Sequence, residues 1–282
     1  MVIPCIWEEA WRFSEGLARV KNDNDKWGVI DKMGSVVCPC LWRSIENFSE
    51  GLAWVRDDNW KYGFIDKTGA VVCPCQWRDR YDFIEGLASV MDDSGKWGLI
   101  DKTGAVVIPC MWKDARRFSE GLANVKDANG KWGFIDKTGF VVIPCTWEDA
   151  DNFSDGLAKV RDANGKYGFI DKTGSVVIPC QLREPGSFFE GLARVRDNWK
   201  DGFIDKTGTV VIPCTWKNAW RFSEGLAKVK DDNDKWGFID KTGTVVIPCK
   251  FKDAGLFSEG LAWVMDGNLK WYKIDKTGMV VE

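Results

Sequence analysis

The chain has 282 residues and a hydrophobic content of 45%, which is enough to bury a core in one or two domains. Its 39 basic and 42 acidic residues nearly cancel, so no cationic excess is available to neutralise nucleic-acid phosphates. The absence of histidine removes the commonest general base and the commonest metal ligand.

The N-terminus shows no basic stretch followed by an apolar run, so no signal peptide is visible, and no apolar run reaches membrane-spanning length. We therefore expect a cytoplasmic protein without a membrane span. An extracellular location is the alternative if the numbering is that of a processed chain.

A repeat organises the whole chain. The segment Phe13–Ala18 (FSEGLA) recurs with a spacing of 35 residues, and one spacing of 34 arises from a shortened loop around Asn198. The recurring segments begin at Phe48, Phe83, Phe118, Phe153, Phe188, Phe222 and Phe257. We interpret residues 1–282 as a single domain of eight tandem repeats, and the first residues already belong to the third strand of a repeat.

Three strands are predicted in each repeat, illustrated here by the fourth. The first strand, Gly121–Val125, leads through an Asn-Gly turn to the second, Lys131–Ile135. A turn of sequence Asp-Lys-Thr-Gly precedes the third strand, Val141–Cys145, whose proline places it at a sheet edge or strand end. Residues 148–154 return the chain as an irregular loop or a short helical turn.

Both faces of such a sheet are apolar. Simple alternation places Ile143 and Cys145 on one face of the third strand, and it places Phe134 and Ile135 on opposite faces of the second. A small sheet with two apolar faces requires cover on both sides, so neighbouring repeats are expected to stack.

These motifs resemble the WG (or KWG) bacterial repeat family over the whole chain. The resemblance rests on Gly-Lys-Trp-Gly-Phe-Ile-Asp-Lys-Thr-Gly, Val-Val-Ile-Pro and Phe-Ser-Glu-Gly-Leu-Ala. It implies β repeats that are often treated as interaction modules, and it implies no catalytic residues. Repeat six departs from the pattern at Leu182 and Asp201, where tryptophan is usual, and repeat eight departs at Tyr272 and Lys273. We expect these two repeats to be distorted or adapted to a contact.

The predicted fold class is all-β, with eight three-stranded units arranged in a closed propeller-like ring or in an open β superhelix. The ring is favoured because the terminal repeats carry no polar caps, which an open solenoid needs. The two ends also share one strand phase, so residues 1–7 are expected to pair with residues 270–282. The same matching ends permit head-to-tail assembly.

Two motifs resemble catalytic or metal-binding motifs when each is considered in a single repeat. Asp205–Thr209 resembles the phosphorylation motif of P-type ATPases, but the same tetrapeptide recurs along the chain and is interpreted as a turn. A cysteine follows proline in every repeat and is interpreted as a small buried residue between units. Cys38 and Cys73 create Cys-Pro-Cys, a spacing that fits zinc poorly, so no metal, disulfide or cofactor is predicted.

Candidate binding residues come from positions that differ between repeats. One lies between Ala and Val of the first strand, and the other lies two residues before the phenylalanine of FSEGLA. Because both accept unrelated side chains, they are interpreted as surface, and their aromatic members as binding residues. These residues are Trp11, Trp54, Tyr81, Trp220 and Trp263. The four tryptophans would form one patch if the ring closes, whereas the tryptophans common to the repeats are assigned to the core.

The sequence therefore predicts a non-enzymatic repeat scaffold that binds a protein partner. A self-assembling structural subunit, forming a filament, tube or stack of rings, is one alternative. The other is a carbohydrate-binding module that uses rows of tryptophans. No catalytic residue is predicted, because no acid–base pair stands apart from the repeat.

Overall fold

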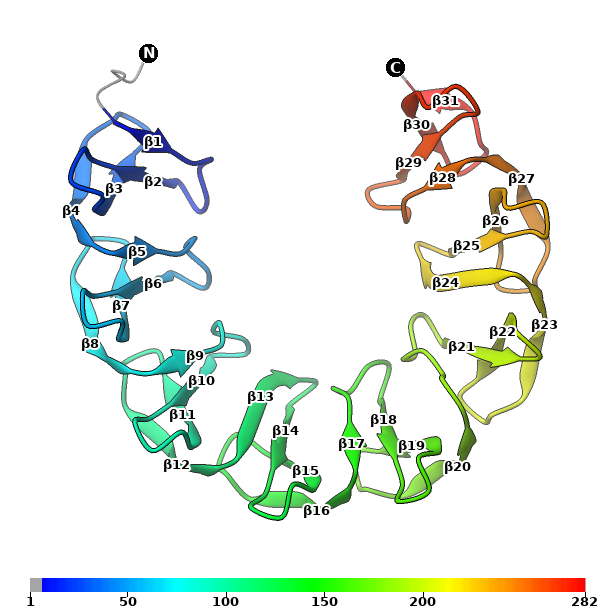
Figure 1. Cartoon of the computed structure of the whole chain (residues 1–282), viewed down its shortest axis with the longest axis horizontal. Coiled ribbons are helices and arrows are strands. Elements are labelled where there is room, and N and C mark those ends of the chain that lie inside the picture. The colour runs from blue at the N-terminus through cyan, green and yellow to red at the C-terminus, as the bar shows by residue number, and fades with distance from the viewer. Residues whose placement is uncertain (1–6, 282) are drawn as a thin grey trace. The chain divides into compact units, whose positions relative to one another are not determined.

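The computed structural model describes residues 7–281, which form β-strands and turns without any helix (Figure 1). Accordingly, this part of the chain offers no helix that is long and apolar enough to cross a membrane. The chain divides into two compact units, Met1–Thr146 and Trp147–Glu282. Each unit consists of successive small antiparallel sheets, and the units are described separately.

The first unit contains four sheets in chain order. Their strands are β1 (Glu9–Ala10), β2 (Leu17–Lys21), β3 (Trp27–Asp31) and β4 (Val36–Trp42); β5 (Ser44–Ile45), β6 (Leu52–Arg56), β7 (Tyr62–Asp66) and β8 (Val71–Trp77); β9 (Asp79–Arg80), β10 (Leu87–Met91), β11 (Trp97–Asp101) and β12 (Val106–Trp112); β13 (Asp114–Ser119), β14 (Leu122–Lys126), β15 (Trp132–Ile135) and β16 (Val141–Trp147).

The second unit continues the same pattern. Its strands are β17 (Asp149–Ala150), β18 (Leu157–Arg161), β19 (Tyr167–Asp171) and β20 (Val176–Leu182); β21 (Leu192–Asp197), β22 (Lys200–Asp205) and β23 (Val210–Trp216); β24 (Asn218–Ser223), β25 (Leu226–Lys230), β26 (Trp236–Ile239) and β27 (Val245–Phe251); β28 (Asp253–Ala254), β29 (Leu261–Met265), β30 (Trp271–Asp275) and β31 (Val280–Val281).

Seven of the eight sheets have four strands where the sequence predicted three. The extra strand lies in the segment expected to be an irregular or helical return. In the second sheet it pairs Ile45 with Val55 and Ser44 with Arg56. The sixth sheet, β21–β23, keeps three strands, because Pro185 stands where Ile45 stands in the second repeat and has no N–H to donate.

The Trp-Gly and Pro-Cys motifs fit against each other across the last two strands of a sheet. A Cβ atom on Gly98 would lie 2.5 Å from the carbonyl oxygen of Ile108 and 2.7 Å from the nitrogen of Cys110, so only glycine fits. The register changes beside this contact, with Leu99 opposite Ile108 and Trp97 opposite Trp112. The motif is therefore required for backbone packing.

Repeat eight carries Tyr272 at the glycine position. Its last strand, β31, pairs Val281 with Lys273 and Val280 with Ile274.

The bulge corrects the predicted face of the cysteine. Ile108 joins the core cluster of Leu99 and Ala115, whereas Cys110 packs against the cluster of Phe64 on the other side of its sheet. Simple alternation placed this isoleucine position and this cysteine position on one face. The bulge at proline shifts the alternation, and the prediction is wrong on this point.

Cores form between consecutive sheets. One cluster combines Phe64 and Cys73 from the second sheet with Phe83, Val90 and Ile100 from the third. Phe64 meets Phe83 edge to face, with ring centroids 5.1 Å apart. The predicted stacking of repeats is confirmed here: each of these sheets supplies one face to the cluster, and a single repeat would leave that face uncovered.

The Ser-Glu-Gly turns link one sheet to the next. Glu15 and Gly16 both have positive φ, 50° and 88°, as a type I′ hairpin turn requires. An Oε atom of Glu15 accepts the N–H of Gly51, at 3.2 Å, and pairs with Lys67, at 2.8 Å. Glutamate is unusual at positive φ, and these contacts with the following sheet explain why it is kept there.

The Asp-Lys-Thr-Gly segments are turns, as predicted. An Oδ atom of Asp66 accepts the N–H groups of Thr68, at 2.8 Å, and Ala70, at 3.1 Å, and the Thr68 hydroxyl, at 2.6 Å. The hydroxyl bond is the largest cause of a pKa of Asp66 below its ordinary value. Gly69 at φ 83° brings this turn against the preceding sheet, where its Cβ would meet Val37.

The predicted pairing of residues 1–7 with residues 270–282 falls largely on residues 1–6 and 282, and these lie outside the described residues. Cys5 lies outside them too.

Candidate functional site

Four of the five predicted binding residues are exposed: Trp11, Tyr81, Trp220 and Trp263. Trp54 is only 4% exposed, so the prediction that it lies on the surface is wrong. Its side chain packs toward the next sheet and stacks on Phe83, with ring centroids 5.6 Å apart. Three polar residues at the same position of the first strand in other repeats are also buried, namely Ser89, Asn124 and Lys228.

That position is buried in four sheets, half-buried at Arg19, Lys159 and Arg194, and exposed at Trp263, because what its side chain packs against changes from sheet to sheet. Ser89 donates to the carbonyl oxygen of Arg116, at 3.2 Å, and Lys228 donates to that of Ala254, at 2.6 Å. Ser89 and Lys228 therefore each have a hydrogen-bond acceptor on the following segment, which offsets the cost of their burial.

The exposed aromatic residues also have neighbours within their own units. Tyr81 stacks on Trp97, with centroids 5.1 Å apart. The guanidinium of Arg19 lies 5.0 Å from the ring of Trp11, and Lys273 lies 5.2 Å from that of Trp263. Of the predicted residues, only Trp220 lines one of the hollows described below.

Repeat six contains the most distinctive side-chain group. Asp201 replaces the repeat tryptophan and is fully buried. Its carboxylate accepts from Arg196 Nε, at 2.7 Å, and Nη2, at 3.1 Å, and from Arg194 Nη1, at 3.1 Å. It also accepts the backbone N–H of Ala219, at 2.8 Å. A buried carboxylate requires such partners, and here they are two guanidiniums.

Asp201 thereby orients two cations at the surface. The Arg194 and Arg196 side chains are partly exposed, while the carboxylate between them is inaccessible. The hydrogen bond to Asp201 is the main cause of a raised pKa for Arg196. Other repeats place an aromatic ring here, as when Arg19 lies 5.8 Å from the Trp27 ring.

The first hollow beside this group, here called the cationic hollow, has a volume of about 490 Å³. Arg194, Arg196 and Arg221 line it together with Trp220, and its lining includes no acidic residue. The Arg221 guanidinium lies 4.4 Å from the ring of Phe189, which holds it at the wall. The remaining lining residues are Gly186, Ser187, Phe189, Asn218, Ala219 and Leu256.

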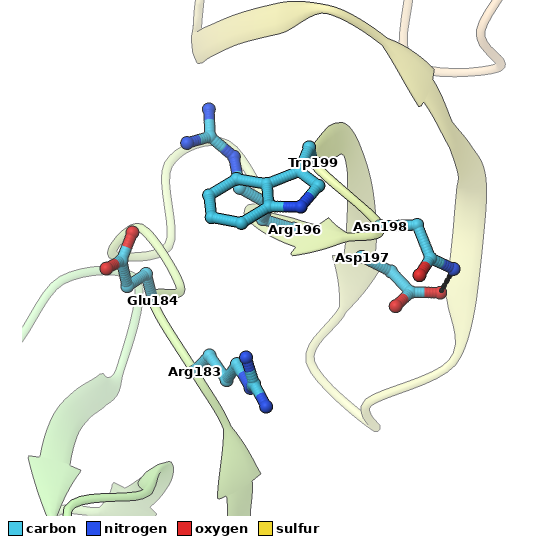
Figure 2. A pocket seen from close by; sticks show the side chains of 6 residues that line it. All are labelled: Arg183, Glu184, Arg196, Asp197, Asn198 and Trp199. Carbon is cyan, nitrogen blue, oxygen red and sulfur yellow. Dashed lines mark hydrogen bonds between the residues drawn. The ribbon is translucent and has the colours of Figure 1, made fainter.

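A second hollow, here called the tryptophan hollow, has a volume of about 360 Å³. Figure 2 shows Arg183 and Glu184, from the segment after β20, facing Arg196 and Trp199 of the β21–β22 hairpin. The Nδ2 of Asn198 donates to Asp197, at 3.2 Å. Charges of both signs line this hollow, so the cationic hollow is the stronger anion site.

The short loop of repeat six determines the position of Trp199. Asp197 pairs with Lys200, so only Asn198 and Trp199 connect the two strands. Both have positive φ, 46° and 63°, which fits a type I′ turn, although a bulky side chain is rare there. Trp199 is 86% exposed as a result.

Sequence reasoning singled out Trp220 and the Asp201 replacement, but not the arginines or Trp199. A signal was available in the hairpin loop. Repeats three, four and five place Gly95, Gly130 and Gly165 at the position of Trp199, and a tryptophan in a slot that favours positive φ is a local conflict.

The cysteines form part of the packing between strands. The nine described cysteines are free thiols. The Sγ of Cys110 lies 3.8 Å from the carbonyl oxygen of Val90, on the next-but-one strand of its sheet. Burial raises the pKa of Cys75 and of Cys110 to about 11, so both are neutral thiols at pH 7. No group of three or more metal-ligating side chains occurs within residues 7–281.

The family model described as "WG containing repeat" matches eight segments over most of the chain. They are residues 1–27, 27–59, 62–96, 97–132, 132–167, 167–200, 202–236 and 236–269. No curated protein matches the sequence.

Solved structures resemble the chain at low sequence identity. The computationally designed Ika8 protein is 10% identical with a TM-score of 0.46, covering 94% of each chain. BamB from Moraxella catarrhalis is 10% identical with a TM-score of 0.43, covering 96% of this chain and 94% of its own. Hsv2p from Kluyveromyces lactis is 9% identical with a TM-score of 0.43, covering 82% of this chain and 92% of its own.

Proposed function

Because the chain belongs to the family of WG-containing repeats, we propose that it is a non-enzymatic scaffold whose cationic hollow binds an acidic segment of a protein partner. The observation that carries this proposal is the buried Asp201 carboxylate, which holds Arg194 and Arg196 at the mouth of that hollow. Asp201 stands at a position where the other seven repeats carry tryptophan or tyrosine.

The chemistry of the hollow favours carboxylates. Guanidiniums bind carboxylate groups through paired, charge-assisted hydrogen bonds. Arg221 adds a third cation, and the exposed ring of Trp220 offers an apolar surface to the rest of a bound segment. Buried arginine and tryptophan contacts also dominate the energy of many protein interfaces.

A peptide is favoured over a nucleic acid because the chain has 42 acidic residues against 39 basic ones. A long polyphosphate would meet repulsion outside the hollow, whereas a short acidic segment contacts only the local cations.

Calorimetric titration with a deca-glutamate peptide tests the proposal. We expect saturable binding that weakens as salt rises, and a loss of about tenfold in affinity for Arg221→Ala, because one charge-assisted contact is removed. Lys252→Ala is the matched control, since it also removes a surface cation from the second unit but lies outside the hollow. No binding by the unaltered chain, or equal losses in the two variants, would contradict the proposal.

The closed propeller-like arrangement of the eight repeats belongs to the same proposal, with the open superhelix as its alternative. Small-angle X-ray scattering distinguishes them, because closure limits the maximum dimension to the diameter of the ring, whereas an open superhelix of the same repeats extends further. The scaffold proposal also predicts a monomeric chain in light scattering and no retention on glycan arrays. Filaments or glycan binding would instead favour self-assembly or carbohydrate recognition.

A further inference from the structure

Repeats two and six share a set of three residues that no other repeat contains. Arg43, Arg56 and Trp60 occupy the same repeat positions as Arg183, Arg196 and Trp199. At the tryptophan position the other repeats carry Asp25, Gly95, Gly130, Gly165, Asp234 and Leu269, and none of them has arginine at both other positions. The three residues therefore occur as a set.

In repeat two the three side chains contact one another. The guanidinium of Arg43 lies 3.7 Å from the Trp60 ring centroid, and that of Arg56 lies 4.1 Å from it. Trp60 nevertheless has φ 66° and is half-exposed. A bulky residue at positive φ is costly, so its contact with two cations offsets local strain.

The arginines around Trp60 form no close ion pair, although the Asp58 carboxylate feels the charge of Arg43. Among the ion pairs of the described residues, none involves Arg43, Arg56 or Arg78. The Nε atom of Arg56 is buried without a hydrogen-bond partner. Repeat six differs here, because Asp201 compensates Arg196, whereas Tyr62 stands at that position in repeat two.

Arg56 and Arg78 border an open hollow of about 530 Å³, and Arg43 lies beside it over the Trp60 ring. Arg56 and Trp60 form one side and Arg78 of the next repeat another. The only acidic lining residue is Asp93, and it is already paired with Lys61. Arg56 and Arg78 therefore present guanidinium charge to the hollow without a close ion pair among the described residues.

We propose that this hollow of repeat two is a second binding site, in the first unit, for a carboxylate-bearing peptide segment. Arg43, Arg56 and Arg78 bind the carboxylates, and Trp60 shifts from the two guanidiniums to the bound segment as they engage it. The choice of ligand class rests on the proposed function, whereas the site itself rests on the arginines that gather at this hollow without a close ion pair.

The competing explanation is that Arg43 and Arg56 only pin the loop that carries Trp60. Under it, Arg43→Ala lowers thermal stability but changes no binding. Under the proposal, the same variant weakens peptide binding at Trp60 and leaves repeat six unaffected.

Fluorine NMR of the full chain labelled with 5-fluorotryptophan distinguishes these explanations. The resonances of Trp60 and Trp220 are assigned through Trp60→Phe and Trp220→Phe, and deca-glutamate is titrated. We expect both resonances to shift saturably. Arg43→Ala should weaken the Trp60 response by about tenfold and leave that of Trp220 unchanged. Arg183→Ala, at the same position of repeat six, is the matched control and should leave the Trp60 response unchanged.

The outcomes separate the two proposals. If the Trp220 resonance shifts on titration and the Trp60 resonance does not, the second site is overturned and the proposed function stands. If the Trp60 resonance shifts and the Trp220 resonance does not, only the role of repeat six is overturned. An Arg43→Ala variant that binds at Trp60 as tightly as the unaltered chain would also overturn the second site, whatever its stability.

Discussion

At the scale of single residues, the recurring motifs of the repeat are explained by backbone geometry. Gly98 is needed because strand β12 crosses within van der Waals contact of its α-carbon. The sequence identified Trp-Gly as a feature of the fold, since a motif used in so many repeats is a poor candidate for a single site. It gave no way to see that the glycine faces a bulge at Pro109, because alternation patterns assume regular strands.

Replacing Gly98 with alanine should therefore be severe. The added methyl group would collide with backbone atoms that cannot move independently, and we expect a loss of about 3 kcal/mol in the free energy of unfolding. Gly267→Ala is the control, because nothing lies within 4 Å of its Cβ position. Urea denaturation measures both, and similar midpoints for the two variants would contradict this explanation of the motif.

The cysteines lead to a second prediction at this scale. With pKa values raised to about 11 by burial, Cys75 and Cys110 carry almost no thiolate at pH 7. Iodoacetamide should label these two cysteines much more slowly in the folded chain than in the urea-unfolded chain. Mass spectrometry of tryptic peptides measures the labelling rate of each cysteine. Labelling at the same rate in both states would show that these thiols are not protected.

At the scale of elements, the links between sheets are what the sequence predicted least well. A two-residue strand such as β5 has no periodicity to detect, so the fourth strand was missed. Burial at the variable position of the first strand was missed because Trp54, Ser89 and Lys228 have no common property. Each is matched to the sheet that follows, a tertiary effect that no single repeat displays.

The turn carboxylates contribute to these links. Glu85 pairs with Lys137, at 3.1 Å, and accepts the N–H of Gly121, at 3.4 Å. We expect Glu85→Ala to cost about 1 kcal/mol, since the pair is partly screened by solvent. Glu85→Gln keeps an acceptor for Gly121 and should cost less. Thermal unfolding of both variants measures the difference, and equal midpoints would show that the backbone contact contributes nothing.

At the scale of the whole molecule, the small stabilising contributions of the turn carboxylates add up, because the same turns recur along the chain. Stability is therefore expected to depend on pH. The threonine hydroxyl and turn N–H groups lower the pKa of Asp66, and the Gly260 N–H and Lys276 lower that of Glu224. Carboxyls with a lowered folded pKa stabilise fully above their unfolded values, near 4, and lose this contribution as pH falls through the folded pKa.

The midpoint of thermal unfolding should accordingly be level between pH 7 and about pH 5 and fall steeply below about pH 4. Circular dichroism at several pH values, at constant ionic strength, tests this. A midpoint that stays level down to about pH 2 would contradict the structural role of these turns.

The repeat architecture and the family were predictable because the signal is present many times in one sequence. The site in repeat six was only half predictable: the Asp201 replacement and Trp220 are visible, but the convergence of Arg194 and Arg221 on one hollow depends on how two sheets pack. A position that departs from its repeat indicates where function lies, and the fold is needed to say which other side chains join it.

Restoring the repeat residue is the most direct test of the central claim that Asp201 creates a carboxylate-binding hollow. The Asp201→Trp variant gives repeat six the aromatic ring of its neighbours, and Asp201→Asn keeps an acceptor for Ala219 while removing the charge. Calorimetry with deca-glutamate should show weakening of about tenfold or more in both variants, with circular dichroism unchanged. Full affinity in two folded variants would contradict the claim.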